Sequence, residues 1–66
     1  MESSFEYDIF ENRPDGVKIW RDCVTGKDAA CKKVGELGRQ TKNEIFAIRL
    51  STSEVIARAN AKKADQ

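Results

Sequence analysis

The chain opens with an alternation of apolar and polar positions. In Phe5–Phe10 (FEYDIF) the odd positions are apolar and two acids lie between them, a period of two that is typical of a strand with one buried face. The segment Asn12–Gly16 (NRPDG) follows, and its proline, aspartate and glycine favour a type I turn with a glycine bulge. Val17–Val24 is apolar on both faces and is predicted to return as the second strand, with a register that a bulge at Gly16 would shift.

A helical period follows the second strand. Thr25–Asp28 (TGKD) matches a capping box, in which the threonine hydroxyl accepts a hydrogen bond from the amide three residues later. The helix is predicted from about Gly26 to Lys42, and Asn43 is expected to take the left-handed conformation at its end. The predicted buried stripe recurs every three or four residues, at Ala30, Val34, Leu37 and Thr41.

The last third of the chain predicts a second hairpin. Glu44–Leu50 alternates, Ser51–Ser53 forms a turn, and Glu54–Asn60 returns. The final segment also fits a helix, because a serine and a glutamate three residues apart match a capping box and alanines follow; its two β-branched residues favour the strand. A tight turn would place three cross-strand pairs on one face: Leu50 with Val55, Ile48 with Ala57, and Phe46 with Ala59.

These elements predict an α+β domain of ββαββ plan. A right-handed crossover helix makes the second and third strands run in the same direction, so the third can pair antiparallel with the first. We expect one four-stranded antiparallel sheet, in the order 2-1-3-4, with the helix packed on one face. The single domain covers residues 1–60, and residues 61–66 are expected to form a flexible tail. The predicted core contains Tyr7, Ile9, Ile19, Ala30, Val34, Leu37, Phe46, Ile48, Leu50 and Val55.

Composition restricts the classes of function. The chain has 66 residues, 39% of them hydrophobic and 35% charged, which is the balance of one small folded domain. Its net charge of +1 gives no overall field toward nucleic acid or an anionic membrane, and no apolar run is long enough to span a bilayer. The acidic start, MESSFEYD, has no apolar secretion signal, so a cytoplasmic location is expected.

The chain contains no histidine, the commonest general base and metal ligand. Zinc needs four ligands, and Cys23 and Cys31, eight residues apart, do not supply them. We therefore expect no enzyme activity, no catalytic residue, no cofactor and no metal site. The cysteines are expected to be small, partly buried thiols; a disulfide would need an oxidising compartment, and a redox or metal role is the remaining alternative.

A stripe of small residues runs along the predicted helix and consists of Cys31, Gly35 and Gly38. Glycine inside a helix costs about 0.5–1 kcal/mol relative to alanine. The stripe indicates either the close approach of another backbone, such as that of a partner subunit, or a helix that tolerates its glycines or ends early at Gly38.

The sheet face away from the helix is the candidate binding surface, because exposed apolar patches are typical of interaction sites. We expect a homodimer or a protein partner stacked on it. The alternatives are single-stranded nucleic acid on aromatic and basic side chains, and rings that only cover the monomer. Three acids on that side, Glu6, Asp8 and Asp22, argue against nucleic acid. The candidate binding residues are Phe10, Lys18, Trp20, Ile45, Arg49, Ile56 and Arg58.

The chain also resembles small uncharacterised bacterial proteins of ββαββ plan, through YDIFENRPDG, then IWRDCVTGKDAACKKVGELGRQTKNEIFAI, then a short final strand. The resemblance covers roughly residues 5–60. It implies a stand-alone domain with no assigned activity, so no functional residue is carried over. Ser53 stands where such proteins would have a turn glycine, which leaves the type of the last turn open.

Overall fold

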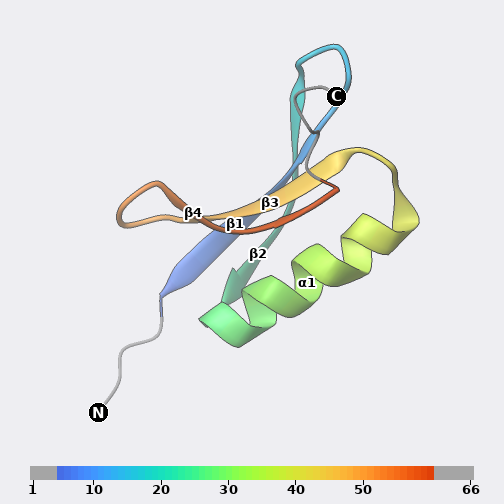
Figure 1. The fold of residues 1–66 in the computed structure, drawn as a ribbon. Helices are drawn as coiled ribbons and strands as arrows, with labels where there is room; N and C mark the ends of the chain where they lie inside the picture. Colours follow the sequence, from blue (N-terminus) through green and yellow to red (C-terminus); the bar gives the residue numbers. More distant parts are fainter. Residues whose placement is uncertain (1–4, 61–66) are drawn as a thin grey trace.

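The protein has one four-stranded sheet, and one helix lies across one of its faces (Figure 1). The computed structural model describes residues 5–60, so the predicted tail, residues 61–66, lies outside the described residues. In chain order the elements are β1 (Glu6–Asn12), β2 (Lys18–Thr25), α1 (Lys27–Gln40), β3 (Glu44–Arg49) and β4 (Glu54–Ala59). The predicted ββαββ order is confirmed, and the final segment is a strand rather than a helix.

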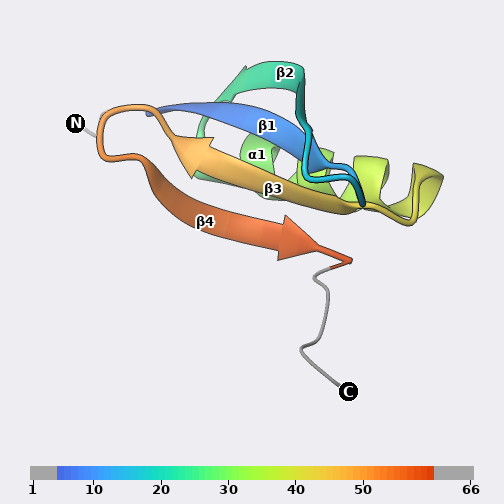
Figure 2. The same cartoon turned by 90° about the horizontal axis from the view of Figure 1, so that it is seen from above.

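The strands lie in the order β2-β1-β3-β4, and each neighbouring pair is antiparallel. Figure 2 shows them side by side in this order, with α1 behind the sheet. Because α1 connects two strands that run in the same direction, it brings β3 alongside β1 and joins the two hairpins at the centre of the sheet. The predicted sheet order and single covering helix are confirmed. Within residues 5–60, no helix is long and apolar enough to cross a membrane.

The first hairpin closes through the predicted turn. The amide of Gly16 donates to the carbonyl of Arg13 at 2.9 Å, and the amide of Arg13 donates to the carbonyl of Val17 at 2.8 Å. Gly16 has a φ of 90°, and the side chain of Asp15 accepts a hydrogen bond from the amide of Val17 at 3.1 Å. This is the pattern of a type I turn followed by a glycine bulge.

The helix begins differently from the prediction. Thr25 is still in β2, paired with Glu6, so its hydroxyl does not cap the helix. Gly26 is the N-cap residue, with a φ of 96° and no side-chain cap. Its amide donates to the carbonyl of Phe5 at 2.8 Å, and its carbonyl accepts from Ala30 at 3.0 Å. The chain passes from strand to helix within one residue, and the positive φ that this requires favours glycine over threonine at the cap.

The helix also ends differently. The C-cap residue Thr41 is extended, and the non-glycine residues with positive φ in the described chain are Ser53 and Asn60. The expected left-handed exit at Asn43 is therefore wrong. The side-chain amide of Asn60 donates instead to the carbonyls of Gly38 and Thr41, each at 2.8 Å. A residue that follows β4 thus bonds the carbonyl end of α1.

The core lies between α1 and the middle of the sheet, and it consists of Tyr7, Ile9, Ala30, Val34, Leu37, Ile45 and Ala47. Five of these residues were predicted. The prediction for β3 was wrong, because Ala47 pairs with Ile9 and Ile45 pairs with Glu11, which places the odd positions of β3 beneath the helix. Four successive apolar residues, Ile45 to Ile48, allow either face to be buried, so pairing with β1 decides the choice.

The remaining predicted core residues lie outside this cluster. Phe46 is only 7% exposed but lies on the opposite face of the sheet, while Leu50 and Val55 are exposed and Ile19 and Ile48 are half-buried. The three predicted β3–β4 pairs are wrong as well. A bulge adds Ile56 to β4, so that Val55 pairs with Ile48, while Ala57 and Ala59 pair with Ala47 and Ile45.

Gly38 is explained within the chain. A Cβ built at this position would lie 2.6 Å from the Cβ of Ala59, so α1 approaches β4 at this point too closely for any side chain. At Gly35 the nearest atom is Nη1 of Arg39 at 3.9 Å. The close approach that the small-residue stripe indicated is therefore made by β4 at Gly38, and it does not need a partner subunit.

Candidate functional site

We call the sheet surface opposite α1 the open face. Figure 1 shows α1 on one side of the sheet and no other described element on the opposite side. The alternation of β1 and β3, together with the pairing of their neighbours, assigns the side chains to this face. Its apolar members are Phe10, Trp20, Phe46, Ile48, Leu50 and Val55.

Trp20 is the most exposed large apolar side chain of the open face, with 55% of its surface accessible. It reaches this face because it pairs with Phe10, in the part of the hairpin next to the turn; the bulge at Arg21 comes after it, so that Ile9 pairs with Asp22. The indole Nε1 donates to Oδ1 of Asp8 at 3.2 Å. The hydrogen bond orients the ring across β1 and leaves most of it accessible.

Phe10 and Phe46 form a stacked pair at the centre of the open face. Their ring centroids are 5.8 Å apart and their planes differ by 24°. They belong to the paired strands β1 and β3, and Phe46 is almost fully buried. The centre of the open face is therefore packed by the protein itself, and the accessible apolar surface lies around it, on Trp20, Leu50 and Val55.

Charged groups lie toward the two ends of the open face. Glu6 and Asp8 are at the start of β1. Lys18 and Arg58 are near the other end, since Lys18 pairs with Asn12 and Arg58 pairs with Phe46. Nη1 of Arg58 contacts Oε2 of Glu44 at 2.9 Å. Glu6 and Lys18 are exposed and form no ion pair with any residue from 5 to 60.

Of the seven predicted binding residues, the structure brings four to the open face: Phe10, Lys18, Trp20 and Arg58. Three others were assigned to the wrong surface. Ile45 is fully buried in the core. Arg49 pairs with Tyr7 on the helix side, with its guanidinium 4.5 Å from the ring centroid of Phe5. Ile56, the extra residue of the β4 bulge, packs against the core.

These errors arise because the sequence analysis assigned the wrong side chains of β3 and β4 to the face beneath the helix. Once the odd positions of β3 lie under α1, the open face gains Ile48, Leu50 and Val55, which the sequence placed in the core. Asp22 lies on the helix side for a different reason, the bulge at Arg21 in β2, and its carboxylate contacts Nζ of Lys33 at 3.4 Å. In β1, acids alternate with apolar residues and so indicate which side of the strand is buried. In β3, four successive residues are apolar, and the sequence gives no such indication.

Glu11 is a buried carboxylate that the sequence reasoning missed. It is 8% exposed, and it accepts hydrogen bonds from Asn43 Nδ2 at 2.6 Å, from Thr41 Oγ1 at 3.1 Å and from Nη1 of Arg21. The hydrogen bond from Asn43 is the main cause that lowers the pKa of Glu11, with Arg21 and Thr41 acting in the same direction against desolvation. Both carboxylate oxygens are occupied, so Glu11 joins β1, β2 and the α1–β3 connection and is not poised as a general base. The sequence does contain a signal that Glu11 is buried, because Glu11 is the next alternate residue of β1 after the inward-facing Tyr7 and Ile9.

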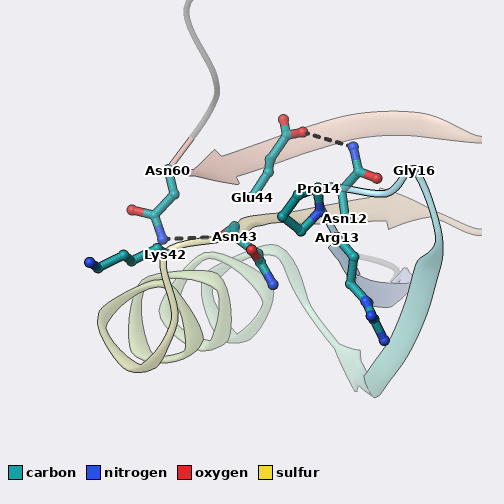
Figure 3. Close-up of a pocket in the computed structure, with 8 residues that line it drawn as sticks. All are labelled: Asn12, Arg13, Pro14, Gly16, Lys42, Asn43, Glu44 and Asn60. Carbon is teal, nitrogen blue, oxygen red and sulfur yellow. Dashed lines mark hydrogen bonds between the residues drawn. The ribbon is translucent and has the colours of Figure 1, made fainter.

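A concavity of about 410 Å³ lies between the β1–β2 turn and the α1–β3 connection (Figure 3). Its two cations, Arg13 and Lys42, point away from each other in Figure 3, and Arg13 contacts Asp15 at 3.3 Å. Glu44 contacts Arg58, and the Nδ2 of Asn12 lies 3.4 Å from Glu44 Oε1. The side chains labelled in Figure 3 do not converge on a common point, so the concavity lacks the geometry of an anion or metal site.

Cys23 and Cys31 are both unpaired and exposed, which corrects the expectation that they are partly buried. Cys23 lies opposite Asp8 on the open face. Desolvation by neighbouring side chains, followed by the charge of Asp8, raises the pKa of its thiol. A raised pKa lowers the fraction of reactive thiolate. Residues 5–60 contain no group of three cysteine, aspartate or glutamate side chains placed to hold a metal ion.

Comparison with models of protein families, with curated proteins and with solved structures gives no match for this chain.

Proposed function

We propose that this protein is a non-enzymatic interaction module that forms a homodimer through the open face of its sheet. The observation that carries the proposal is the exposure of Trp20, Leu50 and Val55 on a sheet surface that no described element covers. An apolar surface of this kind is typical of an interface. A sheet that packs on a second sheet about 10 Å away would remove these side chains from water.

A small domain gains most from such a partner. A chain of this length has a core that is close to the lower limit for independent stability, and a second copy adds apolar burial without a longer chain. Trp20 is a suitable anchor, because its indole offers a large area that is already oriented by Asp8. We propose a cytoplasmic location for this function, a compartment in which the thiols of Cys23 and Cys31 would stay reduced.

Single-stranded nucleic acid is the second candidate, favoured by the proximity of Trp20, Phe10 and Lys18 on neighbouring strands. Two observations oppose it. Phe46 is buried by its own neighbours and offers no free ring for a base. Glu6 and Asp8 lie on the same face, where they would repel phosphates.

Size-exclusion chromatography with light scattering tests the proposal. The monomer has a mass of 7.4 kDa, and we expect the measured mass to double as the protein concentration rises. Trp20→Ala is expected to give a folded monomer, because the core beneath α1 stays intact. Val17→Ala is the matched control, since Val17 is 51% exposed but lies in the turn segment outside β2, away from the open face.

A wild-type chain that stays monomeric at millimolar concentration would contradict the proposal. If Trp20→Ala unfolds according to circular dichroism, the ring belongs to the monomer core and not to an interface. Quenching of Trp20 fluorescence by a single-stranded oligonucleotide at low salt, lost when salt is added, would favour nucleic acid instead.

A further inference from the structure

The charges of the open face are divided between its two ends. Among residues 5–60, the acidic end consists of Glu6 and Asp8, with no cation beside them on this face. The basic end consists of Lys18 and Arg58 together with Glu44, whose carboxylate contacts Arg58. The formal charge of these described side chains is therefore −2 at the acidic end and +1 at the basic end. Such a surface is complementary to itself when one copy is reversed along the strands.

Two symmetric ways of stacking the open faces follow from this. In a two-fold dimer of stacked sheets the symmetry axis lies in the plane between the sheets. If the axis runs along the strands, each acidic end lies over the other acidic end. If the axis runs across the strands, each acidic end lies over the basic end of the other copy.

We propose, on the basis of the homodimer proposed above, that the second copy docks with the two-fold axis across the strands, so that Glu6 of each copy faces Lys18 of the other. Both side chains are exposed and have no ion pair among residues 5–60, so both are available for this contact. Symmetry makes the contact twice in each dimer. Apolar burial of Trp20 is common to both arrangements and supplies affinity, while the charges select between them.

The test reverses one charge at a time and then mixes the variants. In Glu6→Lys every Glu6–Lys18 contact becomes lysine against lysine, and in Lys18→Glu it becomes glutamate against glutamate. We expect each variant alone to raise the dissociation constant about tenfold or more, because two contacts change from attraction to repulsion. An equimolar mixture restores both contacts and is expected to dimerise within about threefold of the wild type. The double variant Glu6→Lys/Lys18→Glu is expected to do the same.

Lys32→Glu is the matched control, because it makes the same charge change on an exposed residue of α1, on the other side of the sheet. It is expected to leave the dissociation constant unchanged at the same ionic strength. Recovery in the mixture also shows that both single variants are folded.

The outcomes separate the two proposals. Single variants that dimerise like the wild type, or a mixture that does not recover, would overturn the arrangement and leave the homodimer standing. A wild-type chain that remains monomeric overturns both.

Discussion

Gly38 offers a direct test of the packing between α1 and β4. A Cβ at this position would lie 2.6 Å from the Cβ of Ala59, whereas non-bonded carbon atoms pack at about 3.5–4.0 Å. Gly38→Ala therefore requires the helix and the strand to separate by about 1 Å. The movement would also strain the hydrogen bond from the Asn60 side chain to the Gly38 carbonyl.

Two opposing effects set the size of the change. Alanine favours the helix over glycine by about 0.8–1 kcal/mol, whereas an extra methyl group in a tight contact costs about 1–3 kcal/mol. Because 2.6 Å is far inside normal contact, we expect Gly38→Ala to lower the free energy of unfolding by about 1–2 kcal/mol. Gly35→Ala meets only the flexible end of Arg39, so propensity dominates and about 1 kcal/mol of stabilisation is expected.

Thermal and urea unfolding by circular dichroism measure both variants, at one protein concentration so that any dimerisation contributes equally. A change of 1 kcal/mol shifts the Tm of a domain this small by about 4–8 °C, so the two alanines move it in opposite directions. Adding Ala59→Gly to Gly38→Ala removes the second methyl, and a double-mutant cycle should show coupling between the sites. If Gly38→Ala stabilises the protein as much as Gly35→Ala, the reasoning about this contact is refuted.

Three further predictions concern single residues. Ser53 has a φ of 61°, so Ser53→Gly should raise the unfolding free energy by about 0.5–1 kcal/mol in urea titrations, and a loss would contradict the strain argument. Glu11→Gln should cost about 2 kcal/mol. Because the folded pKa of Glu11 lies below its ordinary value of 4.5, its contribution is complete above that pH and is lost as the pH falls through the folded pKa; the variant should lack this part of the acid dependence of Tm. Leu37→Ala should cost about 2–5 kcal/mol and Lys32→Ala almost nothing, whereas equal effects would mean a different helix phase.

The elements that the sequence predicted correctly are those in which a single local signal dominates. The acids of β1 fix which of its sides is buried, NRPDG carries its own turn geometry, and Ala30, Val34 and Leu37 mark one stripe of α1. With these elements in place, the direction of β3 allows it to pair antiparallel with β1, and this pairing gives the observed topology.

The open face was predicted less well, because its composition depends on pairing and not on local pattern. Ile45 and Phe46 are both apolar, and pairing with β1 sends the first inward and the second outward. The bulges at Arg21 and Ile56 each shift a strand by one residue, and neither position carries a glycine that would mark it. Trp20 and Phe10 were placed correctly because both lie in the first hairpin, where a local turn restricts the pairing.

The position of β1 has a consequence for the order in which the protein is assembled. One side of β1 pairs with β2, which is the next strand to be synthesised, whereas the other side pairs with β3, which is made only after all of α1. During translation the first hairpin can therefore form while the second side of β1 still presents free amides and carbonyls. Until β3 leaves the ribosome, that side is a template on which the strand of another nascent chain can pair, and faster synthesis of the α1–β3 segment would shorten the time during which it is open.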